Sequence, residues 1–206
     1  MLRVGLTGGV ACGKSTVAEM LRQRGAHIIF ADEIAHQLMR PGEPVYQEVV
    51  KRFGPGVVKP DGQIDRAKLA EAAFDAGRVK ELNMIVHPPV IERQEEWMED
   101  VGRKDPHAIA VVEAALILEA GVGRRFDRLV VVTCKPEHKA ARYAARHCIS
   151  EAAAKADVER RSAAQLPDSE KAAAAHYLID NSGSREETER QVEKVFAELQ
   201  KLAQQS

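Results

Sequence analysis

The sequence predicts an α/β protein built on a three-layer, doubly wound sheet of five parallel strands. Five short apolar runs lack the alternation of apolar and polar residues that marks a strand with one face in water, so both of their faces are expected to be buried. Helical patterns separate these runs, and strands that alternate with helices favour a parallel sheet covered on both sides. The runs are Arg3–Thr7, His27–Phe30, Ile109–Glu113, Leu129–Thr133 and Tyr177–Ile179.

The helices between the strands have recognisable ends. Ser15–Arg24 carries apolar residues at helical spacing and stops at Gly25, a residue suited to the left-handed position that follows many helices. Val90–Val101 and Glu186–Ala203 each place apolar side chains along one face. Ser184, followed three residues later by a glutamate, predicts a capping box at the start of the last helix.

Two segments break the alternation of strands and helices. Residues 33–89 are too long for one crossover and hold turn signals between amphipathic runs, which predicts a small helical insertion. Residues 138–175 contain two charged helical runs, His138–His147 and Ser150–Ala164, that end before Pro167. The predicted core therefore consists of residues 1–32, 90–137 and 176–206.

Composition excludes several classes of protein. Of 206 residues, 45% are hydrophobic and 30% are charged, which excludes a disordered or collagen-like chain. The formal net charge of -1 excludes a globally basic nucleic-acid binder. Three cysteines without a CxxC pair favour a reducing compartment over a disulfide framework. With no signal-peptide pattern and no long apolar stretch, we expect a cytoplasmic monomer that binds neither membrane nor nucleic acid.

A phosphate-binding loop is the firmest feature of the sequence. Residues 8–15 read Gly-Gly-Val-Ala-Cys-Gly-Lys-Ser, the P-loop pattern G-x-x-x-x-G-K-[ST], between a predicted strand and a predicted helix. Glycines let the backbone curl so that its N–H groups point at phosphate oxygens, Lys14 adds a charge, and the Ser15 hydroxyl suits Mg²⁺. The alternative is a glycine-rich turn without a ligand. The sequence thus predicts binding of ATP and Mg²⁺ by Gly8, Gly9, Val10, Ala11, Cys12, Gly13, Lys14, Ser15 and Thr16.

Three further residues near this loop admit two interpretations each. Cys12 is either a small packed residue or a reactive thiol whose pKa is lowered by the adjacent helix. Asp32 follows the second apolar run, where ligands of doubly wound sheets bind. It either acts in catalysis, as a base for an attacking hydroxyl or by holding water on Mg²⁺, or is the N-cap of the next helix. Glu113 ends the third run and either binds the metal directly or has a hydrogen-bonding or packing role.

Basic residues in the segment 138–175 suggest a lid. Arg142 and Arg146 are four residues apart and share one helix face, and Arg161 and Lys171 follow. Mobile arginines suit the negative charge that spreads over a phosphoryl group during transfer. The alternative is a solvated pair of charged helices. No [NT]-K-x-D or L-S-G-G-Q motif occurs, so a small-molecule kinase is favoured over a GTPase or a transporter ATPase, although the residues alone do not identify the acceptor.

Further motifs follow one another in order along the chain. They are Phe30-Ala31-Asp32-Glu33-Ile34-Ala35-His36, Pro41-Gly42-Glu43-Pro44, Phe53-Gly54, Asp61-Gly62-Gln63-Ile64-Asp65-Arg66, Leu82-Asn83-Met84-Ile85-Val86-His87-Pro88, Arg161 with Gln165, Lys171, and Ile179-Asp180-Asn181-Ser182-Gly183. With these motifs the chain resembles the dephospho-CoA kinases, a family of P-loop kinases, from Val4 to about Val195. The resemblance implies ATP-dependent phosphorylation of the ribose 3′-hydroxyl of dephospho-coenzyme A, the last step of coenzyme A synthesis.

The resemblance also implies roles for single residues. Asp32 matches the family's presumed base on the acceptor hydroxyl, and His87 lies in the motif near the acceptor within the helical acceptor-binding insertion 33–89. In the lid, residues 138–175, the resemblance makes Arg142, Arg146 and Arg161 phosphate or adenine-side contacts, with Arg146 assigned to catalysis beside Asp32 and Lys14. It places Asn181 near adenine and Arg161 near the substrate.

Some positions depart from the family pattern. Phe30 replaces the first Asp of a D-A-D-x-x-A-R element and His36 replaces its Arg, while Glu113 opens a run that is usually D-V-P-L-L-F, and His176 replaces a common Asp. We still expect an active kinase, because Lys14 and the residues named above remain. The alternatives are a P-loop kinase for a nucleoside monophosphate or a sugar acid, and a nucleotide-binding module without catalysis.

Overall fold

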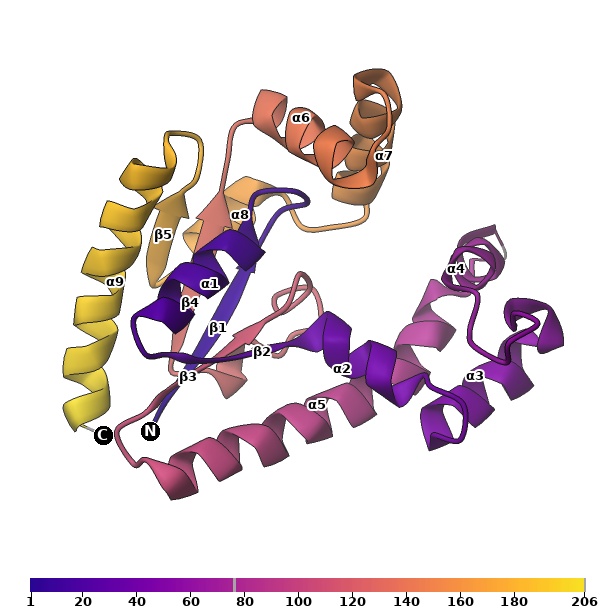
Figure 1. The fold of residues 1–206 in the computed structure, drawn as a ribbon, viewed down its shortest axis with the longest axis horizontal. Helices are drawn as coiled ribbons and strands as arrows, with labels where there is room; N and C mark the ends of the chain where they lie inside the picture. The colour runs from indigo at the N-terminus through magenta and orange to yellow at the C-terminus, as the bar shows by residue number, and fades with distance from the viewer. Residues whose placement is uncertain (76, 206) are drawn as a thin grey trace. The chain divides into compact units, whose positions relative to one another are not determined.

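The computed structural model describes residues 1–75 and 77–205 and divides them into two compact units. The first unit contains Met1–Ile29 and Asp100–Ser206, and the second contains Phe30–Glu99. Figure 1 shows the helices and strands of both units.

The first unit is built on the predicted five-stranded sheet. Its strands lie in the order β2-β3-β1-β4-β5, and β1 pairs in parallel with β3 and β4, as β4 does with β5. Nearly every residue of β1, β3 and β4 is buried, which explains why these segments read as apolar runs without alternation. The expected burial of both faces is wrong for β2 and β5, which are only partly buried because each has a neighbouring strand on one side alone. The strands are β1 Leu2–Gly8, β2 His27–Phe30, β3 Ile109–Glu113, β4 Arg128–Thr133 and β5 Tyr177–Asp180.

Helices cover both faces of this sheet, as a doubly wound fold requires. Helix α1 packs against α9 and both contact β1 and β3, whereas α8 packs against β4 and lies behind the sheet in Figure 1. Helices α6 and α7 pack against each other, and a short turn, η2 (Gly123–Arg125), precedes β4. The helices of this unit are α1 Lys14–Gln23, α6 Pro136–His147, α7 Glu151–Ala163, α8 Asp168–Ala173 and α9 Arg185–Gln205.

The predicted helix ends are confirmed at α1 and α9. Gly25 follows α1 with φ of +106°, which only glycine adopts without cost. Ahead of α9, the Ser184 amide donates to Glu187 Oε2 at 2.7 Å and the Glu187 amide donates to Ser184 Oγ at 3.2 Å. This reciprocal pair is the predicted capping box.

The second unit is helical, with one small hairpin. An antiparallel bridge between Val58 and Ile64 forms the hairpin, and the Tyr46 hydroxyl donates to the Gly62 carbonyl at 2.7 Å, which holds its turn. Asp65 then caps α4, because its Oδ1 accepts from the amides of Ala67 and Lys68. The elements are α2 Ala31–Leu38, α3 Pro44–Phe53, η1 Pro55–Val57, α4 Arg66–Asp75 and most of α5 Val79–Lys104.

Helix α5 is longer than the sequence pattern predicts. The expected helix Val90–Val101 is a part of it, because the structure starts the helix at Val79 and carries it through Pro88 and Pro89. Proline lacks the N–H that an interior helical position donates, so the pair reads locally as a boundary. Apolar side chains on both sides of the pair, including Val86 and Val90, are buried, and this packing overrides the local preference.

Candidate active site

The phosphate loop connects β1 to α1 in a backbone conformation that depends on residues of positive φ. Gly13 is the N-cap of α1 with φ of +89°, and Ala11 has φ of +55°. A side chain on Gly13 would also collide with Asn181, since a Cβ there would lie 2.1 Å from Asn181 Nδ2. The predicted glycine is therefore required both by conformation and by space. The loop ends where α1 begins, so the positive end of the helix dipole lies at the loop.

Lys14 and Ser15 stand at the start of α1. The Lys14 ammonium donates to the loop's own carbonyls, at 3.2 Å from Gly8 and 3.0 Å from Gly9. Ser15 is exposed, and residues 1–75 and 77–205 contain no cluster of three histidine, cysteine or acidic side chains that could hold a metal ion. A single exposed hydroxyl, that of Ser15, fits Mg²⁺, because this ion is usually held by one or two protein oxygens together with phosphate oxygens and water.

Asn181 joins the end of the last strand to the phosphate loop. Its Nδ2 donates to the Cys12 carbonyl at 2.9 Å, and its Oδ1 accepts from the Thr188 hydroxyl at 2.9 Å. The side chain is buried, so both bonds form away from water. The predicted contact with adenine stays a prediction. Asn181 directly follows β5, and its hydrogen bond to the Cys12 carbonyl gives it an additional role as a support of the loop.

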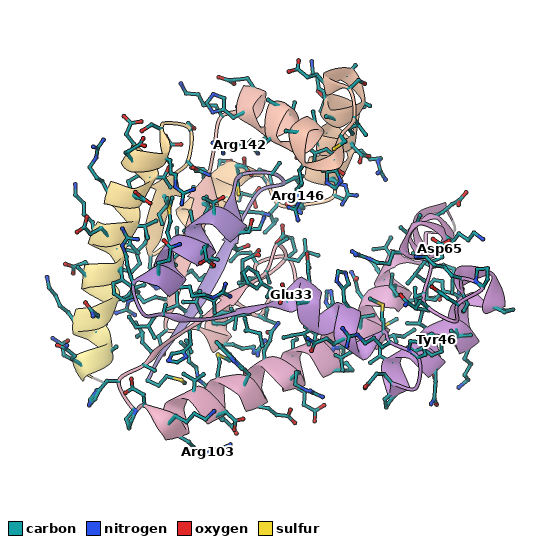
Figure 2. All side chains as sticks on the ribbon, in the orientation of Figure 1. Glu33, Tyr46, Asp65, Arg103, Arg142 and Arg146 are labelled. Carbon is teal, nitrogen blue, oxygen red and sulfur yellow. The ribbon has the colours of Figure 1, made fainter. Side chains whose placement is uncertain are left out.

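Two of the predicted arginines lie on α6, above the phosphate loop. Arg142 donates to the Asn181 carbonyl at 2.8 Å and to the Cys12 carbonyl at 3.5 Å, so the first turns of α6 are attached to the loop. Arg146 lies one turn further along and is exposed. Figure 2 shows both side chains on the side of α6 that faces the loop. A guanidinium at Arg146 is thus available to solvent or to a ligand.

Helices α6 and α7 form a hairpin with its own small core. Tyr143, Ala144, Ala154 and Val158 are buried together, and Val10 and Ala11 of the phosphate loop pack against them. The hairpin is therefore more than a solvated pair of charged helices. Arg161 lies on α7, where its Nε is 3.7 Å from Asp157 Oδ2 and its guanidinium is 5.8 Å from the centre of the Tyr143 ring.

Cys12 is a packed residue, and the interpretation as a reactive thiol is wrong. Its side chain is fully buried beneath the loop, and this burial raises the pKa of the thiol despite the neighbouring Lys14. Burial likewise raises the pKa of the Cys134 thiol to about 11. A protonated, inaccessible sulfur is inert.

Asp32 lies in the first turn of α2, with an exposed side chain. The N-cap of that helix is Phe30, so the interpretation of Asp32 as the cap is wrong. His36 follows one turn later, and burial, together with the positive charge of Arg66, lowers its pKa against the opposite effect of Asp32 and Glu33. The imidazole at position 36 therefore favours the neutral form, unlike the arginine that the family pattern has there.

His87 and Glu113 complete the predicted positions. His87 lies within α5, directly before Pro88, and burial lowers its pKa. Glu113 is the last residue of β3, in register with Leu6 of β1, and its two interpretations remain predictions. The roles assigned to both residues through the family resemblance are likewise predictions.

Sequence reasoning does not single out a buried ion pair next to the phosphate loop. Lys139 on α6 hydrogen-bonds to Asp168, the first residue of α8, and the Lys139 side chain is only 9% exposed. Helical spacing could have found the lysine, because it lies three residues before Arg142 on the same face. Nothing in the spacing indicates that Asp168 would be its partner.

A second buried pair lies between α8 and the segment after β3. The Lys171 ammonium is 2.8 Å from Glu119 Oε1 and donates to Gln165 Oε1 at 3.0 Å and to the Ala115 carbonyl at 3.5 Å. The same carbonyl accepts from the Thr7 hydroxyl at 3.3 Å. The lysine expected among the lid's basic residues is thus committed to the protein interior, with its side chain 1% exposed.

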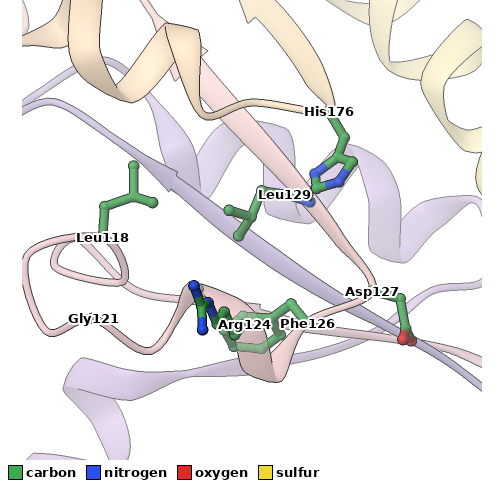
Figure 3. A pocket seen from close by; sticks show the side chains of 8 residues that line it. Leu118, Gly121, Arg124, Phe126, Asp127, Leu129 and His176 are labelled. Atoms are coloured by element: carbon green, nitrogen blue, oxygen red, sulfur yellow. Dashed lines mark hydrogen bonds between the residues drawn. The ribbon is translucent and has the colours of Figure 1, made fainter.

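A cavity of about 390 Å³ lies elsewhere in the first unit. Figure 3 shows its lining, which includes Leu118, Phe126, Leu129 and His176. Leu129 is the second residue of β4 and His176 directly precedes β5, so the cavity lies toward the amino-terminal ends of these strands, whereas the phosphate loop follows the carboxyl end of β1. It is separate from the site described above.

The family model and the curated relatives point to the same family. A family model described as dephospho-CoA kinase matches residues 2–187. A dephospho-CoA kinase of Aquifex aeolicus is 40% identical over 200 residues, which cover 97% of this chain and 98% of that protein. Among solved structures, the TT1252 protein of Thermus thermophilus is similar with a TM-score of 0.76 and 33% identity, covering 95% of this chain and 96% of that one. A dephospho-CoA kinase of Campylobacter jejuni matches with a TM-score of 0.68 and 26% identity, covering 96% of both chains.

Proposed function

This chain belongs to the dephospho-CoA kinase family, whose reaction is the ATP-dependent phosphorylation of dephospho-coenzyme A, and we propose how its own residues divide that work. The observation that carries the proposal is the phosphate loop itself, curled between β1 and α1 and attached through Cys12 to Asn181 and Arg142. These contacts fix the backbone of the loop that would receive the phosphates of ATP.

On the nucleotide side, residues 8–16 hold the phosphates with backbone N–H groups and the positive end of α1. Lys14 leaves the carbonyls of Gly8 and Gly9 for the β- and γ-phosphates, a more favourable partner for an ammonium. Ser15 would hold Mg²⁺, which neutralises part of the developing charge when it is bound. Asn181 contacts the adenine side of the nucleotide.

On the acceptor side, Asp32 orients the ribose 3′-hydroxyl of dephospho-coenzyme A and accepts its proton as the oxygen attacks the γ-phosphorus in line. The insertion 33–89 holds the acceptor, with His87 among its contacts. The lid 138–175 supplies Arg142 and Arg161 to the substrates and Arg146 to the γ-phosphoryl group. An exposed carboxylate in the first turn of a helix and an exposed guanidinium on α6 support these roles.

The localisation, the partners and the oligomeric state that we propose rest on the composition and on the lengths of the helices. In the described parts of the chain, no helix combines the length and apolar character that a membrane crossing needs. The formal charge of -1 supports an enzyme that acts on a small molecule and takes no nucleic acid. We place it in the cytoplasm as a monomer.

The experiment is ADP release with ATP, Mg²⁺ and dephospho-coenzyme A, run beside AMP, CMP, gluconate and a control without acceptor. Turnover with dephospho-coenzyme A alone is expected. Asp32→Asn should lower kcat by about 10²–10⁴ while leaving ATP binding intact, because only the general base is lost. A loss below tenfold would remove Asp32 from that role. Lys14→Ala should lower kcat by about tenfold or more through lost phosphate positioning, and unchanged turnover would contradict its role.

A further inference from the structure

Gly9 is the second residue of the phosphate loop, and its lack of a side chain has an unusual cause. Gly9 is not one of the glycines with a positive φ, so its backbone conformation does not require glycine. The lack of space for a side chain does require it. A Cβ on Gly9 would lie 2.5 Å from Asp168 Oδ1 and 3.0 Å from Lys139 Nζ. The three heavy atoms nearest to that position all belong to Lys139 and Asp168.

The pair that occupies this space is not an ordinary surface ion pair. Lys139 is 9% exposed and Asp168 is 38% exposed, so the lysine is largely removed from water. A dehydrated ammonium depends on its partner far more than an exposed one does. The two residues also come from different elements, since Lys139 belongs to α6 and Asp168 begins α8.

Lys139 near the start of α6 and Asp168 after the end of α7 bracket the hairpin α6–α7 in the chain. Residue 139 lies near the beginning of the lid and residue 168 lies just after Pro167, where α7 has ended. A hydrogen bond between them therefore joins the two stems of the lid directly over Gly9. One turn after Lys139, Arg142 binds the carbonyl of Cys12, so α6 contacts the phosphate loop at two successive points.

We propose that Lys139 and Asp168 are positioning residues for ATP. Their ion pair, here called the clasp, joins α6 to the start of α8 and packs against Gly9. The clasp holds the loop against α6 and fixes where Arg142 and Arg146 stand above the phosphates. The two charges are paired with each other, so we expect neither to contact the nucleotide. The inference rests on the proposed use of the loop for ATP, but it does not depend on Asp32 or on the acceptor.

The test measures the ATP dissociation constant by calorimetry without acceptor, and the kinetic constants for both substrates. Asp168→Ala should weaken ATP binding by about tenfold, within the range of couplings between contacting groups, and raise KM for ATP but not for dephospho-coenzyme A. Asp168→Asn keeps an oxygen that accepts from Lys139 and should retain most of the affinity. Lys155→Met is the matched control, because it breaks an exposed pair on α7 with Glu159, 4.0 Å apart, and should change neither value.

Gly9→Ala supplies the second arm. In the wild-type chain its Cβ must displace Asp168 and open the clasp, so ATP binding should weaken about as much as in Asp168→Ala. When Gly9→Ala is added to Asp168→Ala, the ATP dissociation constant should rise by less than about threefold, since the carboxylate that the Cβ would meet is gone. If the effects of Gly9→Ala and Asp168→Ala on ATP binding were additive, the proposal of a clasp would be overturned.

Two other results would also overturn it. If Asp168→Ala tightened ATP binding, Lys139 would be a phosphate ligand that Asp168 restrains. If Asp168→Ala lowered the unfolding midpoint but left the ATP dissociation constant and KM unchanged, the pair would be merely structural. Loss of ATP binding in the wild-type protein would instead refute the proposed function, which separates the two failures.

Discussion

Replacing Lys171 by methionine tests how the buried pair between α8 and the segment after β3 contributes to stability. The change keeps the length of the side chain and removes its charge. Glu119 then loses an ammonium 2.8 Å away in a setting where its side chain is 16% exposed, and its Oε2 is already buried without a hydrogen-bond partner among the described residues. Removing one partner of such a pair costs about 3–5 kcal/mol, because the remaining charge is buried and uncompensated.

The same reasoning makes a less obvious prediction about a second substitution. Glu119→Gln added to Lys171→Met removes the uncompensated charge, and a glutamine oxygen can still accept from the Leu166 amide, now at 3.0 Å. The double variant should therefore be more stable than Lys171→Met alone, by about 1–3 kcal/mol. Glu119→Gln, which should destabilise the wild-type protein by breaking the ion pair, is therefore expected to stabilise the Lys171→Met variant.

Urea unfolding followed by circular dichroism measures these differences as shifts of the midpoint at constant slope. Lys155→Met is again the control, since its exposed pair should contribute less than about 0.5 kcal/mol. The reasoning is refuted if Lys171→Met costs no more than this control. It is equally refuted if the double variant is less stable than Lys171→Met.

The thiols, a half-buried histidine and the capped last helix each give a measurable outcome. Cys148 is exposed and should react with a thiol reagent in the native protein, whereas Cys12 and Cys134 should react only on unfolding; three fast thiols would contradict this. Because burial raises the pKa of Cys134 from 9.0 to about 11, its share of the unfolding free energy is complete below pH 9 and is lost as the pH rises toward 11, and Cys134→Ala should flatten that slope. Burial lowers the pKa of His87, so the unfolded chain binds the proton more readily and stability falls as the pH drops through about 6.5; His87→Gln should remove this part of the acid slope, and an unchanged slope would count against it. Ser184→Ala should cost about 1 kcal/mol of the unfolding free energy measured in urea, and a neutral result would show that the capping box is not needed.

Much of the first unit could be predicted because its signals are local. All five apolar runs became strands, with changes of one residue or so at their ends, although only β1, β3 and β4 are buried on both faces. The phosphate loop was predictable for the same reason, since its glycines, Lys14 and Ser15 are contiguous. The start of α5 was not, because Pro88 and Pro89 look locally like a helix boundary and only tertiary packing carries the helix through them.

Long-range partnerships could not be read from the sequence. Lys139 and Asp168 are separated by 29 positions, and Lys171 and Glu119 come from different elements, so no spacing rule pairs them. Asn181 could be placed after the last strand but not beneath the loop, because the depth of its side chain depends on Thr188 and Arg142. The function could be predicted without these contacts, because the order of the motifs along the chain is enough to indicate a family.

The attachment of Cys12 to Asn181 has a consequence for protein synthesis. The loop residue and its support are 169 positions apart, and the support's own partner, Thr188, comes later still. A ribosome therefore releases the nucleotide motif well before it releases the groups that hold the backbone of the motif. Until those groups have emerged, the nascent chain carries the motif without its supports, so we expect bound nucleotide to assist folding only after β5 and α9 have been made.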